Sequence, residues 1–279
     1  MRSKPKEGFS MKVSSKAIML FDFVRFYFKA ETIYQQDSPL IYGFCKNVLE
    51  RYIQVHLPET TRYQKSCLNN TTAINITPIG SQSKLLSTSQ TTIQEIAKTA
   101  SSNISKCKII TAIAKWNNTS TALELGTNLG IMSSALAESG LSVVTVEGNK
   151  ELFDRNLTHL QSINNLECHS KLFKDFLKQN NTKFDLIFID GDHSYKSTID
   201  IIDSTKKILK VGGFIILDDI RWSLGMKKVW DEIISCDQFN LCIDLFAFGI
   251  VGTKPDLKAP LHKKLIPKKY KPWPYFFFR

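Results

Sequence analysis

Short apolar runs alternate with helical segments after Thr119, and this rhythm constrains the fold more than any other feature of the sequence. Such alternation is typical of βαβ units, which build a parallel sheet. The last two runs are too close together for a parallel crossover and therefore predict a hairpin at an antiparallel edge of the sheet. The runs are ALEL (122–125), SVVTVE (142–147), FDLIFID (184–190), GFIILDD (213–219), LCIDLF (241–246) and FGIVG (248–252), with helical segments expected at 130–139, 149–163 and 195–209.

The part of the chain before this pattern is expected to be mainly helical. Apolar side chains recur every three or four residues over 15–30, and Ser38 with Pro39 is suited to begin a second helix. The polar composition of 64–90 predicts a long loop. We therefore expect a helical N-terminal region (1–75), a domain that contains the sheet (76–253) and a C-terminal tail (254–279).

Composition excludes several classes of protein. With 43% hydrophobic and 23% charged residues, the chain has the makeup of a folded globular protein. No apolar run reaches the roughly 18 residues that a membrane span requires. The six cysteines show no CxxC pair, which favours reduced thiols over zinc ligands or disulfides and fits a cytoplasmic protein.

Much of the formal charge of +11 lies in the tail. Residues 254–279 contain eight Lys or Arg and one Asp, interleaved with Trp273, Tyr275 and the aromatic run 276–278. A basic segment with aromatic side chains is suited to nucleic acid or to another anionic surface. The alternative is a solvated tail whose aromatic rings pack back on the body.

The sequence ELGTNLG (124–130) follows one apolar run and precedes a helical segment. Gly126 allows the backbone to turn tightly and approach a ligand, and Gly130 opens a helix whose N–H groups favour an anion such as a carboxylate. The spacing differs from the G-x-G-x-x-G of dinucleotide-binding proteins, which disfavours NAD. The alternative is an ordinary glycine-rich turn without a ligand.

Glu147 ends the next apolar run, about twenty residues after Gly126. An acidic side chain at this edge of a parallel sheet can accept hydrogen bonds from both hydroxyl groups of a ribose. The alternative is a solvated glutamate at the end of a strand. Together, the two motifs favour a nucleoside-containing cofactor.

Three carboxylates follow two further runs. Asp190 ends one run, and Asp218 with Asp219 ends the next, so a parallel sheet brings them to one edge. They repel one another unless they bind a divalent cation such as Mg²⁺ or contact a cofactor's ammonium group. His193 lies three residues after Asp190 and has the chemistry of a general base, although a histidine that holds the loop by hydrogen bonds is the alternative.

At these motifs the sequence resembles class I S-adenosylmethionine-dependent methyltransferases, and more narrowly the metal-assisted O-methyltransferases that include catechol O-methyltransferase. The DGDHSY run (190–195) is closer to small-molecule and sugar O-methyltransferases. From Asp37 to about Gly249 the chain is also similar to uncharacterised methyltransferases of the Bacteroidetes type. The matching residues are Glu124, Gly126 and Gly130 for the first motif, Glu147 for the ribose, and Asp190, Asp218 and Asp219 for the metal.

The resemblance implies further roles and shows departures. His193 stands where the catechol enzyme has a catalytic lysine, and Asp219 stands where it has an asparagine. Met132 replaces a serine that contacts the cofactor's carboxylate, so Ser133 is expected to substitute for it. Besides the residues named above, the expected cofactor site includes Thr127, Gly148 and Asp190, and the expected catalytic residues are His193 and Asp190.

We therefore expect an α/β protein with a Rossmann-like, seven-stranded, mostly parallel sheet, an antiparallel C-terminal hairpin and a helical N-terminal region. The predicted activity is S-adenosylmethionine-dependent methylation of a small-molecule or sugar hydroxyl, with His193 as base and Mg²⁺ as a second cofactor. One alternative is methylation of RNA or another polyanion. Another is a catalytically silent binding module on the same fold.

Overall fold

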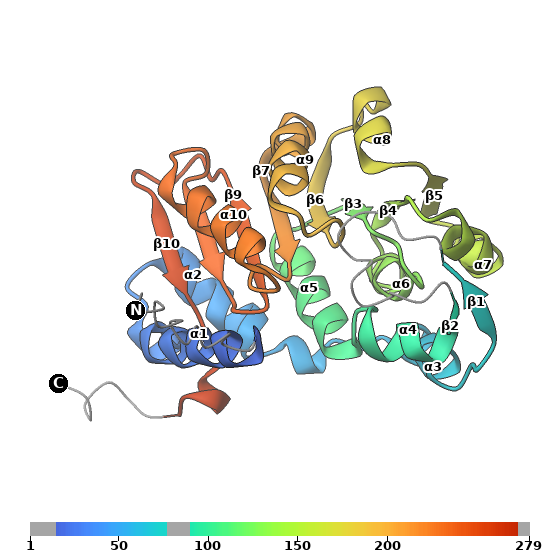
Figure 1. Cartoon of the computed structure of the whole chain (residues 1–279). Coiled ribbons are helices and arrows are strands. Elements are labelled where there is room, and N and C mark those ends of the chain that lie inside the picture. Colours follow the sequence, from blue (N-terminus) through green and yellow to red (C-terminus); the bar gives the residue numbers. More distant parts are fainter. Residues whose placement is uncertain (1–14, 77–89, 273–279) are drawn as a thin grey trace, which may run out of the picture.

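The computed structural model describes residues 15–76 and 90–272, and within them eight strands form one sheet (Figure 1). The strand order is β10-β8-β9-β7-β6-β3-β4-β5. Strands β3 to β7 run parallel to one another, whereas β9 is antiparallel to both β7 and β8. The strands are β3 (Thr121–Leu125), β4 (Ser142–Glu147), β5 (Leu166–Ser170), β6 (Phe184–Ile189), β7 (Leu209–Asp218), β8 (Leu241–Asp244), β9 (Phe248–Gly252) and β10 (Leu261–Lys264).

Helices cover both faces of this sheet, as the apolar character of its strands requires. Neighbouring residues of a strand enter opposite layers: Phe188 packs towards α5 and α6, whereas Ile187 packs towards α9 and α10. The helices of this part are α5 (Ile104–Trp116), α6 (Ile131–Glu138), α7 (Lys150–Gln161), α8 (Phe173–Gln179), α9 (Tyr195–Ile208) and α10 (Leu224–Ser235). The predicted α/β, Rossmann-like fold is confirmed.

The N-terminal region shares a hydrophobic core with the sheet. The ring of Phe44 packs edge-on against Trp116 at 5.3 Å, and Trp116 stacks on Phe214 of β7 at 6.0 Å. The Glu138 carboxylate, at the end of α6, accepts hydrogen bonds from the backbone N–H and hydroxyl of Thr60. The elements of this region are α1 (Ser15–Lys29), α2 (Pro39–Phe44), α3 (Pro58–Leu68), β1 (Ala73–Asn75), β2 (Gln90–Thr92) and α4 (Ile93–Thr99), with short helical turns at Ile33–Gln35, Cys45–Leu49 and Tyr52–Gln54.

Three details differ from the sequence-based expectation. The hairpin of β8 and β9 forms as predicted, but it is not the edge of the sheet, because β10 pairs with β8 in parallel. This eighth strand comes from the tail, and buried Leu265 and Ile266 directly after it anchor the segment. The loop predicted over 64–90 is partly structured, since α3 continues to Leu68 and β1 pairs with β2. The rest of that loop and the aromatic end of the tail, 273–279, lie outside the described residues.

Candidate functional site

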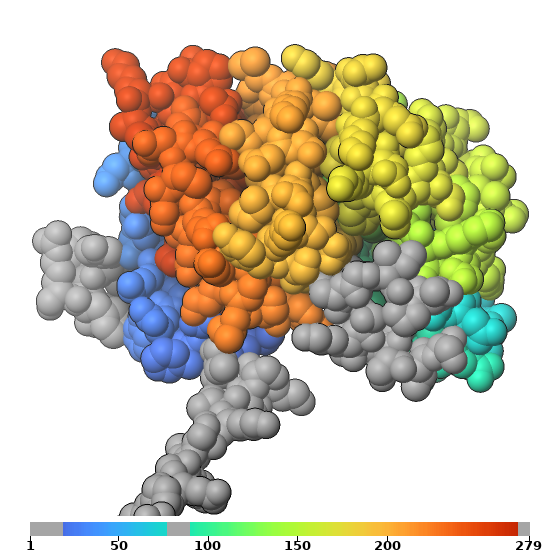
Figure 2. Space-filling model, turned by 45° about the horizontal axis from the view of Figure 1, so that its top comes forward, coloured from blue at the N-terminus to red at the C-terminus, as the bar shows by residue number. Residues whose placement is uncertain are grey.

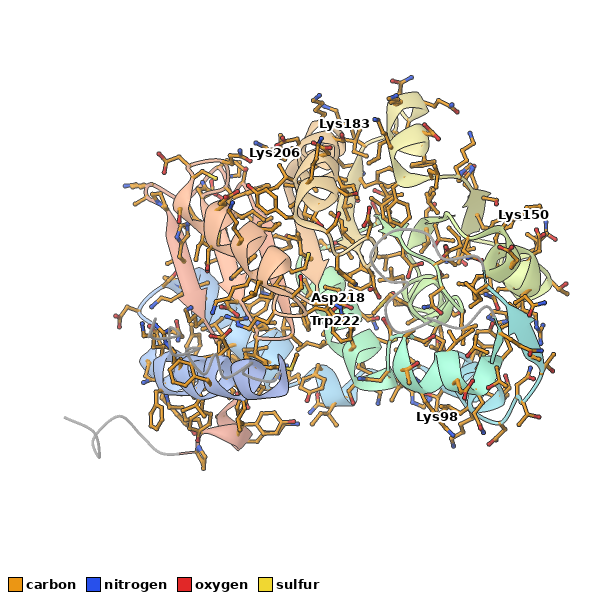
Figure 3. All side chains as sticks on the ribbon, in the orientation of Figure 1. Lys98, Lys150, Lys183, Lys206, Asp218 and Trp222 are labelled. Atoms are coloured by element: carbon orange, nitrogen blue, oxygen red, sulfur yellow. The ribbon has the colours of Figure 1, made fainter. Side chains whose placement is uncertain are left out.

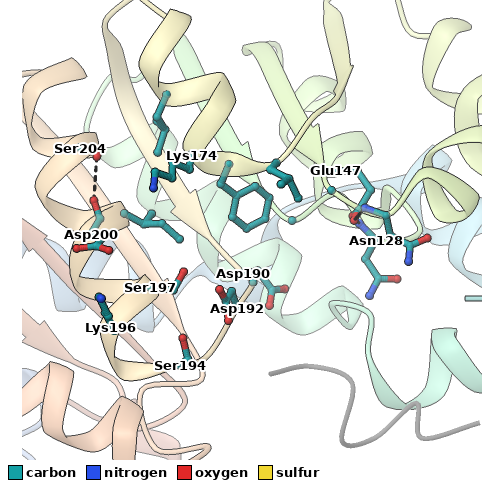
Figure 4. A pocket seen from close by; sticks show the side chains of 18 of the residues that line it. Asn128, Glu147, Lys174, Asp190, Asp192, Ser194, Lys196, Ser197, Asp200 and Ser204 are labelled. Atoms are coloured by element: carbon teal, nitrogen blue, oxygen red, sulfur yellow. Dashed lines mark hydrogen bonds between the residues drawn. The ribbon is translucent and has the colours of Figure 1, made fainter. Parts of the chain in front are cut away.

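The carboxyl ends of β3, β4 and β6 meet at a cavity of about 790 Å³. Four of the predicted cofactor residues line it, namely Gly126, Glu147, Gly148 and Asp190. In Figure 4, Asp190 lies between Glu147 on one side and the side chains of α9 on the other. Helices α8 and α9 lie side by side on this face of the molecule (Figure 2) and supply much of the remaining wall.

The backbone of Gly126 lies very close to the backbone of Asp190 at the carboxyl edge of the sheet. Its φ angle is +113°, and a Cβ atom added there would lie 1.9 Å from the carbonyl oxygen of Asp190. The N–H of Asp190 donates a 2.8 Å hydrogen bond to the carbonyl oxygen of Leu125. Only glycine satisfies both the conformation and this close approach, and the absence of a side chain keeps this part of the cavity open.

Glu147 links the loop that follows its own strand, β4, to the loop that follows β3. Its carboxylate accepts 2.8 Å hydrogen bonds from the backbone N–H groups of Asn128 and Asn149. Burial raises the pKa of Glu147, and these backbone hydrogen bonds act against that increase. Each carboxylate oxygen has a second lone pair, so Glu147 retains acceptor capacity towards the cavity that it lines.

Three predicted cofactor residues instead form a buried polar cluster beneath the glycine turn. Ser133 and Thr145 donate hydrogen bonds to the Glu124 carboxylate, and the hydroxyl groups of Thr127 and Thr145 are 2.6 Å apart. Burial raises the pKa of Glu124 to about 7. Glu124, Thr127 and Ser133 are not among the residues that line the cavity.

Gly130 lies at the start of α6 in the left-handed region, with φ of +75°. A Cβ atom at this position would lie 2.6 Å from a methyl carbon of Leu160. Gly130 therefore allows α6 to begin close to α7, which is a packing role that the motif alone does not reveal. It does not line the cavity.

A lysine that sequence analysis did not assign to the site lies among the three aspartates. The ammonium of Lys106, in the first turn of α5, donates a hydrogen bond to Asp218, and Figure 3 shows Asp218 beside α5. Burial works to lower the pKa of Lys106, but the charges of Asp218, Asp190 and Asp219 outweigh it and raise the pKa. Lys106 is therefore a fixed cation.

The metal site predicted from Asp190, Asp218 and Asp219 does not fit this arrangement. The sheet does bring the three carboxylates to one edge, but the ammonium of Lys106 already binds one oxygen of Asp218 and places a positive charge in the cluster. Among the residues that the structure describes, no group of three or more Asp, Glu, His or Cys side chains is arranged to hold a metal ion. Burial and the neighbouring carboxylates raise the pKa of Asp190 well above its ordinary value and that of Asp219 to about 6.

His193 lies beside this cluster. Its Nε2 atom is 3.8 Å from Asp219 Oδ2 and 3.9 Å from Asp190 Oδ1, distances that are too long for hydrogen bonds. The side chain is buried, and burial lowers its pKa. A neutral imidazole at neutral pH can accept a proton, although His193 does not line the cavity itself.

Sequence analysis missed two kinds of residue. Lys106 is one of three lysines in α5, and no local pattern distinguishes it from the others, since Asp218 is 112 residues away. Asn128 and Phe173 line the cavity, and Asn128 adopts a φ of +50° that is uncommon outside glycine. Its position two residues after Gly126 was the available signal for a ligand-binding loop.

In the described part of the chain, no helix is long and apolar enough to cross a membrane. A curated relative, Uncharacterized protein R132 of Acanthamoeba polyphaga mimivirus, is 31% identical over 75 residues, which are 26% of this chain. The chain spans about a third of that relative's length, 34%.

Two solved structures share the fold. The methyltransferase PaMTH1 of Podospora anserina, solved with S-adenosylhomocysteine (SAH), is 15% identical with a TM-score of 0.50, covering 72% of this chain and 98% of that chain. Rv0187 from MTB, solved with a cofactor, is 14% identical with a TM-score of 0.52, covering 79% and 99%. At these identities the likeness concerns the fold alone.

One family model matches the chain over residues 123–220, and its description is "Methyltransferase domain". The match begins in β3, ends two residues after β7, and includes the glycine turn, Glu147 and the acidic cluster. Over residues 123–220 the chain is therefore similar to a methyltransferase domain, and this matched segment forms part of the Rossmann-like sheet.

Proposed function

We propose that the protein is an S-adenosylmethionine-dependent methyltransferase that methylates a hydroxyl oxygen of a small molecule or a sugar. The observation that carries this proposal is the cavity in which Gly126, Glu147 and Asp190 lie together at the carboxyl edge of parallel strands. Ligands of open α/β sheets bind at this edge. The cavity's volume of about 790 Å³ is within the usual range for a cofactor-sized ligand.

The residues of the cavity suit a nucleoside cofactor with a positive charge. Glu147 would accept hydrogen bonds from the ribose hydroxyls, and Asp190 would face the amino group or the sulfonium. When bound, the cofactor supplies an activated methyl group. His193 would take the proton of the acceptor hydroxyl, and the charge of Asp218 would favour the resulting imidazolium.

We further propose that residues 76–253 are the catalytic unit. The N-terminal region 1–75 would pack over the helices of this unit. The N-terminal helices would then shape the acceptor side without contributing the cofactor motifs. The similarity to the uncharacterised Bacteroidetes-type group also stays a proposal, and it names no acceptor.

Calorimetric titration with SAH tests the function. Glu147→Ala is expected to weaken SAH binding by about 1 to 3 kcal/mol, because it deletes charge-assisted hydrogen bonds and loosens the loops that carry Asn128 and Asn149. Glu147→Gln should lose less, since the amide keeps one acceptor oxygen. Glu167→Ala, an exposed glutamate on the neighbouring strand, is the control and should bind like the wild type. Equal affinity of wild type and Glu147→Ala would remove the assignment.

A polyanion is the second candidate acceptor, proposed from the basic tail. Part of the tail's positive charge is already paired within the protein. Lys263 forms an ion pair with Glu31, and Lys264 Nζ lies 3.6 Å from Asp244 Oδ2. Lys258 and Lys268 remain exposed.

Replacing Lys258 and Lys268 by alanine would test this candidate without removing β10. If these lysines neutralise phosphates, binding to an RNA oligonucleotide should weaken, and the slope of log K against log salt should fall by about 0.7 for each phosphate that is no longer neutralised. Filter binding at several salt concentrations measures both quantities. The absence of RNA binding by the wild type at low salt would end this candidate.

A further inference from the structure

The three aspartates and Lys106 form one electrostatic unit beside the cavity. Asp190 and Asp218 stand at equivalent ends of neighbouring parallel strands and, by the alternation of side chains, face the layer that contains α5. Lys106 approaches from the first turn of that helix. Asp190 lines the cavity, so the unit reaches the place where the cofactor and acceptor would meet.

The helix dipole of α5 disfavours a lysine at position 106. This indicates that the neighbouring carboxylates, and not the helix itself, stabilise the ammonium there. The positive end of a helix dipole disfavours a cation in the first turn. Asn103 caps α5 and accepts a 2.9 Å hydrogen bond from the backbone N–H of Lys106, and this cap fixes where the side chain starts. The side chain is 19% exposed, and that of Asp218 only 1%. The carboxylates compensate for the unfavourable dipole.

The hydrogen bonds of this pair are incomplete. A lysine ammonium has three donors, and among the described residues Asp218 is the one partner found for the ammonium of Lys106. The other oxygen of Asp218, Oδ1, is buried without a hydrogen-bond partner in the described structure. Buried polar groups are normally satisfied, so the pair retains donors and an acceptor for a ligand.

We propose that the ammonium of Lys106 binds the acceptor oxygen and that methyl transfer in this protein uses this fixed cation in place of a divalent metal ion. The inference rests on the proposed methyltransferase function and deepens it. It makes Lys106 a catalytic residue, because its ammonium touches the reacting oxygen.

The chemical step balances with the groups present. The acceptor hydroxyl gives its proton to Nε2 of His193, and its oxygen forms the new bond to the methyl carbon. The carbon–sulfur bond breaks, its electron pair moves to sulfur, and neutral SAH leaves. Lys106 donates a charge-assisted hydrogen bond to the oxygen while negative charge develops there, and it stays protonated throughout.

Metal binding provides a test that does not depend on turnover. Mn²⁺ would be titrated into the SAH-bound protein and followed by electron paramagnetic resonance. The wild type and Lys106→Arg should show no saturable site, because their cation occupies the carboxylate cluster. Lys106→Gln should bind Mn²⁺ at least about tenfold more tightly than the wild type does, since its three carboxylates are left without a cation. Lys263→Gln, which removes a lysine of comparable exposure from its ion pair with Glu31 far along the sheet, is the control and should behave like the wild type.

Activity gives the second readout. With an accepted substrate, EDTA should leave the wild-type rate unchanged, and Lys106→Gln should lower it by roughly 10²- to 10³-fold, as for the loss of one charged donor to a developing oxyanion. One equivalent of tightly bound Mn²⁺ in the wild type, or a rate abolished by EDTA, would overturn the proposal even if Lys106→Gln fails to fold. A protein that does not bind SAH would instead overturn the proposed function.

Discussion

Gly126→Ala is expected to abolish measurable SAH binding and to lower the free energy of unfolding by about 2 to 4 kcal/mol. The new methyl group would lie 1.9 Å from the carbonyl oxygen of Asp190, and the φ angle of +113° is strained for any residue with a Cβ atom. Relief of this clash must separate β3 from the loop after β6, and these are the segments that form the cavity. Urea unfolding and calorimetry measure the two effects.

A substitution at a second glycine distinguishes the effect of the steric clash from the effect of backbone strain. Gly140 has a φ of +93°, but a Cβ atom there would meet nothing within 4 Å. Gly140→Ala should therefore cost only about 1 kcal/mol of stability and leave SAH binding intact. If the two variants are equally stable and bind SAH equally well, the close approach of Gly126 to Asp190 has no functional importance.

His193→Ala is expected to slow methyl transfer by roughly 10²- to 10⁴-fold, the usual span for the loss of a general base. SAH formation with an acceptor found in a screen of sugar and phenol hydroxyls measures this rate. SAH affinity should be retained, because His193 does not line the cavity. His262→Ala, an exposed histidine on β10, is the control and should keep the wild-type rate.

The pH dependence of the rate identifies the base. Burial lowers the pKa of His193 below its ordinary value, so the neutral form persists to lower pH than in a free imidazole. The wild-type rate should be flat near neutral pH and fall only below about pH 6.5. In His193→Ala this acid limb should disappear. An unchanged profile in the variant would assign the base to another group.

The sequence predicted those parts of the site that depend on strand order. Gly126, Glu147 and Asp190 each follow an apolar run, and parallel pairing necessarily brings such positions to one edge. The direction of a side chain was harder to predict. Glu124 belongs to the same motif as Gly126, but alternation along β3 turns it towards Ser133 of α6 instead of the cavity.

Long-range contacts could not be predicted from local patterns. Lys106 joins the acidic cluster through the packing of α5 on the sheet, and periodicity does not specify which helix covers which strand end. Strand β10 is short and basic, so it is similar in composition to a solvated tail. Its pairing with β8 depends on the burial of Leu265 and Ile266 against the body.

Calorimetric titration of the wild-type protein with SAH tests whether the cavity at Gly126, Glu147 and Asp190 binds S-adenosylmethionine. We expect one site per chain with micromolar affinity, equivalent to about −8 kcal/mol, and no binding of NAD. A folded protein that gives no binding signal with SAH at millimolar concentration, or that prefers NAD, would show that this cavity is not an S-adenosylmethionine site.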